Sequence, residues 1–325
     1  MKDNAKLSWF ARYAWFVLAW NIVVILWGVF LRASKSGDGC GQHWLTCNGE
    51  VVPSAPELKT VIEFSHRITS SLDGLIVIGL FAAATFIWYR HRTPENSRTA
   101  KMAAASLLFV IIEGLLGAGL VLTGNTAETL TPERPFWAAA HLINTLILLA
   151  FLTLTVWYAG GGRRLRFGRD PKASVAIIAA VGVIFLVGIT GSIAALTSML
   201  FPSATLSEGI AKDFSPTSNM LLRLRVLHPI VSVASGAALI FVAGWLRGRS
   251  AGDRNVARWS NVVSVLVLAQ IAFGAATLLM LGPIIMQLGH LLLADAIWIS
   301  FVLLAASYLS SRPAGTESDA GDRPV

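Results

Sequence analysis

Eight apolar runs, each close to twenty residues long, constrain this chain more than any other feature of its sequence. Their approximate bounds are 14–31, 66–88, 102–122, 137–158, 174–200, 226–246, 261–281 and 285–308. A helix needs about 20 consecutive apolar residues to cross the hydrocarbon core of a bilayer, whereas a soluble domain buries its apolar residues in periodic stripes. The runs therefore predict an all-α integral membrane protein with eight transmembrane helices.

Composition agrees with a protein of the membrane. Of the 325 residues, 55% are hydrophobic and only 14% are charged, against about 25% charged residues in a typical soluble domain. The first run, from Ala14, is long enough to span a bilayer. We therefore expect it to be the first transmembrane helix and not a cleaved signal peptide.

The distribution of positive charge predicts the orientation of the helices. The formal net charge is +8, and the N-terminus, the loops 89–101, 159–173 and 247–259 and the C-terminal tail hold 18 of the 26 Lys and Arg residues. Since cytoplasmic loops are enriched in Lys and Arg, we expect both termini in the cytoplasm. The charge is then a topology signal, which argues against nucleic acid as a partner.

Two cysteines, Cys40 and Cys47, lie seven positions apart in the first polar loop. Two free thiols and a disulfide are both compatible with this spacing. The predicted topology places the loop outside the cytoplasm, where disulfides form and persist. It therefore favours a Cys40–Cys47 disulfide.

A weak internal repeat divides the chain into two halves. Glu113 precedes Gly117-Ala118 by four positions in the third run, and Gln270 precedes Gly274-Ala275 by four positions in the seventh. We expect two pseudo-symmetric four-helix bundles, parallel in the membrane because each has an even number of spans. The predicted boundaries are 1–158 and 159–311, followed by a disordered cytoplasmic tail, 312–325, that lacks an apolar pattern.

Four of the six histidines carry the main functional signal: His66, His141, His228 and His290. Each lies near the outer end of an even-numbered span, so each half holds two. One such histidine is readily explained by packing, but ionisable residues within spans are costly and usually functional. Paired imidazoles on facing helices suit heme, whereas their spacing does not suit a compact zinc motif. We expect His43, between the two cysteines, to be exposed, and His91 to belong to a basic cytoplasmic loop.

Charged residues near these histidines have both a functional and a structural interpretation. Arg67 directly follows His66, and Arg225 precedes His228 by three positions. They are candidates for binding heme propionates or for interfacial snorkelling. Glu63, three positions before His66, is a candidate for proton chemistry or a carboxylate favoured by the helix dipole. Deeper carboxylates, at Asp73, Glu113 and Asp295, either form hydrogen bonds within the bundle or carry protons.

The chain resembles the heme A synthase family over nearly its whole length. The resemblance is carried by Gly28, Arg32, Ser36-Gly37, Cys40, Trp44 and Cys47, by Glu63-Phe64-Ser65-His66-Arg67, by Gly114-Leu115-Leu116-Gly117 with Val121-Leu122-Thr123, by Gly188-Ile189-Thr190-Gly191-Ser192-Ile193-Ala194-Ala195-Leu196 with Phe201-Pro202, and by Gln270, Gly274, Pro283, Gln287 and His290. It implies an oxidoreductase of cytochrome oxidase assembly that oxidises the C8 methyl of heme O to the formyl group of heme A by successive hydroxylations.

The resemblance also implies roles for the site residues. His66 and His141 would be axial ligands of the substrate heme, His228 and His290 those of a heme b that relays electrons, and Glu63 the acidic residue at the reacting site. Expected partners are heme O, a heme O synthase, an electron donor and the lipid bilayer of a bacterial cell, with homo-oligomerisation left open. Some family members carry a second cysteine pair in the third outer loop. Residues 201–225 contain no cysteine here, so a second disulfide is excluded.

Two other functions remain open from the residues alone. A diheme b-type cytochrome passing electrons from quinol would need no Glu63, and a heme carrier or assembly factor would bind heme without chemistry. The asymmetry between the halves favours the enzyme, because the position three before His228 is Arg225, where the first half has Glu63 before His66.

Overall fold

Eight long helices make up most of the chain in the computed structural model, which describes residues 8–126, 128, 131–250 and 252–311. They are α1 (Trp9–Ala33), α2 (Leu58–His91), α3 (Pro94–Leu122), α4 (Arg134–Ala159), α5 (Pro171–Leu200), α8 (Leu227–Arg249), α9 (Arg254–Leu279) and α10 (Ile284–Ser310). All eight, α8 together with the preceding α7 (Met220–Leu224), are long and apolar enough to cross a membrane. The predicted all-α, multi-pass architecture is confirmed.

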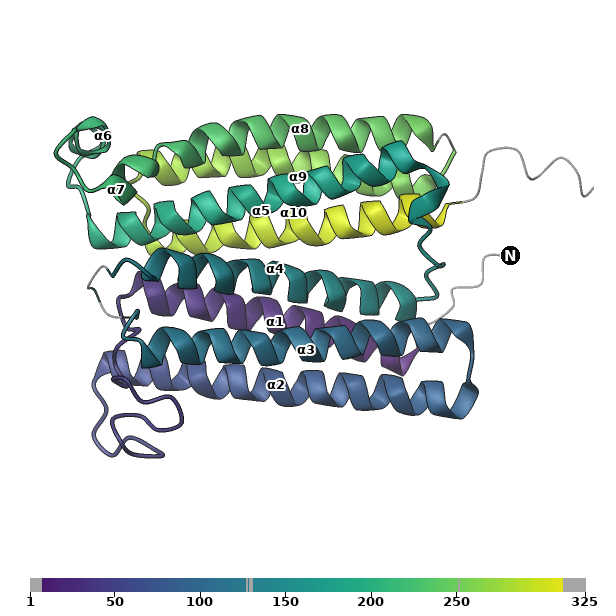
Figure 1. Ribbon diagram of the computed structural model, residues 1–325, viewed down its shortest axis with the longest axis horizontal. Coiled ribbons are helices and arrows are strands. Elements are labelled where there is room, and N and C mark those ends of the chain that lie inside the picture. Colours follow the sequence, from purple (N-terminus) through teal and green to yellow (C-terminus); the bar gives the residue numbers. More distant parts are fainter. Residues whose placement is uncertain (1–7, 127, 129–130, 251, 312–325) are drawn as a thin grey trace, which may run out of the picture.

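The helices form two groups of four that lie side by side (Figure 1), α1 to α4 in one and α5 with α8 to α10 in the other. Within each group, successive helices pack on one another and the first packs on the last. Between the groups, α4 packs on α5 and α10, and α1 packs on α10. The same pattern of neighbours occurs in both halves, which is consistent with two pseudo-symmetric bundles.

The core lies where the two groups meet. Half of the most apolar stretch of α4 and of α10 is buried, against at most 28% in the other six spans. Trp298 of α10 donates a hydrogen bond of 2.6 Å from its indole nitrogen to the carbonyl of Leu146 on α4. The remaining helices expose long apolar faces, as expected of helices that contact lipid.

The N-termini of α2, α4, α8 and α10 lie at one end of the molecule, at the left in Figure 1, which we call the histidine end. The helices that start at the opposite end begin with side-chain caps from Ser8, Thr93, Asp170 and Asp253. Each cap accepts a hydrogen bond from a backbone N–H of the first turn, which would otherwise lack a partner.

Helix α2 begins earlier than its apolar run. The run starts at 66, but the helix starts at Leu58, so two further turns of mixed polar and apolar residues precede the predicted span. These turns pack against the first loop, where a Cβ added to Gly39 would lie 2.4 Å from the carbonyl carbon of Lys59. Contact with the loop therefore extends the helix beyond its apolar run and places Glu63 inside it.

The segment 201–225, which connects two of the predicted spans, contains two short helices. They are α6 (Leu206–Phe214), capped by the Thr205 hydroxyl, and α7, capped by the Asn219 side chain. A further 3-10 turn, η1 (Phe167–Arg169), precedes α5. The tail predicted to be disordered, 312–325, lies outside the described residues.

Candidate functional site

The four histidines singled out by their positions all lie in the first turns of helices at the histidine end. His66 is in α2, His141 in α4, His228 in α8 and His290 in α10. All four are half-buried. The other two do not belong to this site: His43 is exposed as predicted, and His91 is exposed at the end of α2.

Three of the four imidazoles lie against a glycine on a neighbouring helix. A Cβ built on each glycine would come within 2.8–3.1 Å of the ring Cε1 atom, in the pairs Gly28–His66, Gly191–His228 and Gly274–His290. Any larger side chain there would push the ring aside. These three glycines therefore leave room for the imidazoles at the points where the helices approach one another.

In the C-terminal half the two imidazoles face each other. The ring centroids of His228 and His290 are 6.5 Å apart and the ring planes are nearly perpendicular, at 86°. Two imidazoles on opposite sides of one metal ion, each bonded at about 2 Å, put their centroids on the order of 6 Å apart. The observed spacing fits a metal between them.

Hydrogen bonds orient one ring of this pair. His228 Nδ1 lies 3.2 Å from the hydroxyl of Thr190 and 3.4 Å from that of Ser232, which leaves Nε2 for a ligand. His290 Nδ1 is buried and has no hydrogen-bond partner among the described residues. A ring fixed at one nitrogen and free at the other is what an axial ligand requires.

In the N-terminal half, a carboxylate accompanies the histidine pair. His141 Nδ1 lies 3.3 Å from Glu113 Oε1 on α3, close enough for an ion pair but not aligned as a hydrogen bond. His66 Nδ1 is buried without a partner in the described part of the chain. The two histidines are close enough to interact electrostatically. This half therefore also presents two half-buried imidazoles with free ring nitrogens.

The site does not hold a complete metal centre by itself. No group of three or more His, Cys, Asp or Glu side chains that suits a metal ion occurs in the part of the chain that the structure describes. A zinc site takes at least three protein ligands. Pairs of imidazoles therefore fit a metal that brings its other ligands with it.

Glu63 is buried under the first loop and hydrogen-bonded to it. Its side chain is nearly fully buried, and Oε2 accepts a 2.8 Å hydrogen bond from the backbone N–H of Cys40. Oε1 accepts a hydrogen bond of 3.1 Å from Arg67 Nε and forms an ion pair with the same guanidinium. Glu63 is thus a buried carboxylate held in one position, one turn before His66.

The disulfide predicted from topology is confirmed. Cys40 and Cys47 are bonded, with their Cα atoms 4.3 Å apart. The loop that they close docks on α2, where the Thr60 hydroxyl donates to the carbonyl of Gly39 at 2.8 Å. Since the Cys40 amide is also a donor to Glu63, the disulfide loop positions the buried carboxylate.

The two arginines predicted as propionate partners are engaged with protein groups. Arg67 pairs with Glu63 and donates to backbone carbonyls of the first loop, including Thr46 at 3.0 Å. Arg225 pairs with Asp213 of α6 at 2.8 Å. Each arginine thus secures an outer segment onto its histidine helix.

Arg32 is a residue whose position sequence reasoning did not single out as functional. It lies four residues after Gly28, which faces His66, so it is one turn nearer the histidine end on the same face of α1. Its guanidinium lies 3.5 Å from Gln287 Oε1 on α10, and its Nε is buried without a partner among the described residues. Arg134 adds a second positive charge nearby. In the sequence, Arg32 was marked only as one of the residues that carry the family resemblance, without a role.

Two of the deeper carboxylates lie away from the histidines. Asp73 Oδ1 accepts a 2.8 Å hydrogen bond from Asn21 Nδ2, which joins α2 to α1. Asp295 is buried on α10, and its Oδ2 atom has no partner in the described part of the chain. Of the three carboxylates placed within spans, only Glu113 contacts a histidine.

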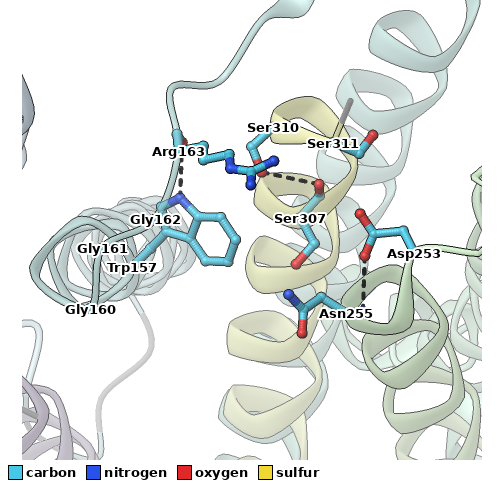
Figure 2. A pocket seen from close by; sticks show the side chains of 10 residues that line it. All are labelled: Trp157, Gly160, Gly161, Gly162, Arg163, Asp253, Asn255, Ser307, Ser310 and Ser311. Carbon is cyan, nitrogen blue, oxygen red and sulfur yellow. Dashed lines mark hydrogen bonds between the residues drawn. The ribbon is translucent and has the colours of Figure 1, made fainter. Parts of the chain in front are cut away.

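A cavity of about 410 Å³ lies at the other end of the molecule. Figure 2 shows its lining, which comes from the ends of α4 and α10 and the start of α9 and includes Trp157, Arg163 and Asn255. None of its lining residues is a histidine or a cysteine. It is therefore separate from the histidine site.

Eight membrane-length helices, with a pair of half-buried imidazoles in each half, place the chain in the class of multi-pass membrane proteins. The sequence matches the COX15-CtaA family, described as cytochrome oxidase assembly proteins, over residues 11–302. Because the match covers most of the chain, the protein belongs to this family.

Curated relatives come from several bacteria. A protein of Thermus thermophilus named protoheme IX farnesyltransferase is 39% identical over 97% of this chain, which spans about half, 51%, of that relative. A heme A synthase of Bacillus mycoides is 27% identical over 89% of this chain and 88% of its own length. A heme A synthase of Halalkalibacterium halodurans is 38% identical over 40% of this chain and 42% of its own length.

Proposed function

We propose that this chain is a heme A synthase, which oxidises the C8 methyl group of heme O to a formyl group. The observation that carries the proposal is the arrangement of four half-buried histidines as one pair in each half of a cytochrome oxidase assembly protein. The heme A synthases among its relatives support the same activity.

Heme fits the histidine pairs. A porphyrin occupies four coordination positions of iron, so two imidazoles complete the set. The 6.5 Å between the rings of His228 and His290 leaves room for one metal ion. Bound heme with two axial histidines supplies one-electron transfer. The residues present therefore suit two hemes, one in each half.

We assign the substrate to the N-terminal half, 1–158, and a heme b relay to the C-terminal half, 159–311. His66 and His141 would hold heme O, and His228 and His290 would hold heme b. The buried carboxylate of Glu63, one turn from His66, supports this division. The matching position in the other half, three residues before His228, is instead the cation Arg225, which pairs with Asp213.

Glu63 is the residue that we assign to the chemical step. Raising a methyl group to the oxidation level of a formyl group removes four electrons, and protons must leave with them. A carboxylate held at one position can accept a proton or stabilise a developing positive charge. Glu63 is fixed at both oxygens by Cys40 and Arg67, which suits it to act on the same face of the substrate at every step.

Arg32 is the cation that we assign to a propionate of heme O. Guanidinium groups pair well with carboxylates, and its buried Nε has no partner among the described residues. Its place one turn above Gly28 directs it to the outer side of His66. Arg67 and Arg225 remain predicted propionate contacts. Each guanidinium would then have to contact a propionate in addition to the protein carboxylate with which it already pairs.

We propose that the histidine end faces outward from a bacterial cell membrane, with both termini in the cytoplasm. The Lys and Arg distribution supports this orientation, as does the disulfide at the histidine end, because disulfides persist outside the cytoplasm. The farnesyltransferase name of the Thermus thermophilus relative supports a heme O synthase as the partner that supplies the substrate. An electron-transfer partner is also required.

The activity is tested by expressing the chain with a source of heme O in cells that lack heme A. Extracted hemes are separated and compared with those from the same cells without the chain. Heme A or hydroxylated heme O is the expected product. A folded, heme-loaded protein that yields neither would overturn the proposal and favour a diheme cytochrome or a heme carrier.

A further inference from the structure

The two halves differ at one matched position that contacts a histidine. Glu113 of α3 and Gln270 of α9 each precede a Gly-Ala pair by four positions. Helix α3 packs on α4, which carries His141, and α9 packs on α10, which carries His290. The internal repeat thus places a carboxylate beside the histidine in one half and an amide beside it in the other.

The Glu113 carboxylate is held rigidly against His141. Its Oε1 lies 3.3 Å from His141 Nδ1 and is contacted by the Thr145 hydroxyl, and its Oε2 accepts a hydrogen bond from Asn144 Nδ2. Asn144 is itself fixed by donating to the carbonyl of Phe109 at 2.9 Å. Both carboxylate oxygens therefore have protein partners, and Oε1 also lies beside the imidazole of His141.

Gln270 makes a different contact with its histidine. Its amide nitrogen donates to the backbone carbonyl of His290 at 3.0 Å and lies 3.4 Å from His290 Nε2. His290 Nδ1 has no hydrogen-bond partner among the described residues. An amide is uncharged, so Gln270 brings no negative charge to the ring.

We infer that Glu113 is a positioning residue that accepts the Nδ1–H of His141 when Nε2 binds the iron of the substrate heme. This inference rests on the proposed function. An acceptor carboxylate fixes the ring orientation and makes the ligand more basic. It therefore favours ferric over ferrous iron in the N-terminal half, whereas Gln270 leaves the C-terminal heme without this effect.

The test is a redox titration in which only one heme is present. In protein with both His228 and His290 replaced by Ala, Glu113→Gln is compared with unchanged Glu113 and with Glu113→Asp. We expect Glu113→Gln to raise the ferrous-to-ferric ratio about tenfold at a fixed potential, or about 59 mV for a one-electron couple. Glu113→Asp should keep a potential close to that of the parent.

The matched control is Gln270→Glu in protein with both His66 and His141 replaced by Ala. It adds a carboxylate in the other half, so it should lower the potential of the remaining heme. It also keeps the inference testable if Glu113→Gln does not fold. A heme that binds normally but whose potential changes in neither half overturns the inference. Failure of any heme to bind His66 and His141 would instead contradict the proposed function.

Discussion

The two halves of the molecule share one helical scaffold but place charge differently around their histidines. In the N-terminal half, the carboxylates Glu63 and Glu113 lie on α2 and α3, next to the histidines. In the C-terminal half, Gln270 takes the place of Glu113, and Arg225 pairs with Asp213, which comes from the outer helix α6. Two sites built alike can therefore hold the same group in unlike electrostatic surroundings.

The difference extends to the segments that cover each site. A disulfide-closed loop covers the start of α2 and donates a hydrogen bond to Glu63 through Cys40. The corresponding segment of the C-terminal half has no cysteine and is built from α6 and α7. The disulfide-closed loop thus belongs to the half to which we assign the chemistry. A fixed position of the Glu63 carboxylate matters most there.

The largest expected effects come from removing one histidine in each half. His66→Ala should abolish product while the protein keeps its heme b, and His228→Ala should remove the heme b absorption band. The reason is that each iron loses one of only two protein ligands. Heme content per protein and extracted heme type measure both results, with the exposed His91→Ala as control. An unchanged spectrum in His228→Ala would refute the division between the halves.

A smaller effect is expected when the charge of Glu63 is removed without changing its shape. Glu63→Gln should lower the rate of product formation by about 10²–10⁴-fold, the usual contribution of a positioned acid or base, and heme content should stay unchanged. Asp213→Asn makes the matching change to the ion pair of the other half. If both variants lower the rate equally, Glu63 has no special part in the reaction.

Loss of the Arg32 guanidinium should weaken substrate binding. A hydrogen bond to a charged group contributes about 1.5–3 kcal/mol, so Arg32→Ala should raise the dissociation constant for heme O by about 10–100-fold. Titration of the apoprotein with heme O measures this change. Lys35→Ala, which removes an exposed cation from the same end of α1, should have little effect. Equal losses in both variants would mean that general charge, not Arg32, binds the propionate.

The smallest effect concerns stability and belongs to the C-terminal half alone. At the start of α5, hydrogen bonds from Tyr308 and from the Ala173 amide, together with Arg249, lower the pKa of Asp170 from 3.8 to about 2. Because the folded pKa is below the unfolded one, this stabilisation is full above about pH 4 and is lost as the pH falls toward 2.

The measurement is the melting temperature in detergent between pH 6 and pH 2. Wild type should lose stability toward low pH more steeply than Asp170→Asn, which lacks the titrating group. Parallel curves for the two proteins would show that Asp170 does not contribute. Heme binding by His66 and His141 should be insensitive to the substitution, since Asp170 lies at the opposite end of the molecule.

Much of the fold could be predicted because a bilayer imposes simple requirements. The eight predicted apolar runs correspond to eight long helices in the structure. Cys40 and Cys47, in the first loop, form the predicted disulfide. Helices α6 and α7 were missed because they are short, so neither has the length that marks a membrane span. The early start of α2 was missed because residues 58–65 mix polar and apolar side chains and so do not extend the apolar run that begins at 66.

The sequence by itself determined the number of spans and placed the four histidines near the starts of their helices, because helix length and periodicity are local properties. Only the tertiary structure decided which groups meet: that Glu63 lies under Cys40, that Glu113 contacts His141, and that Arg67 and Arg225 are already paired. Those contacts join helices that are separate along the chain. They depend on how side chains pack between helices, which spacing along a sequence does not specify.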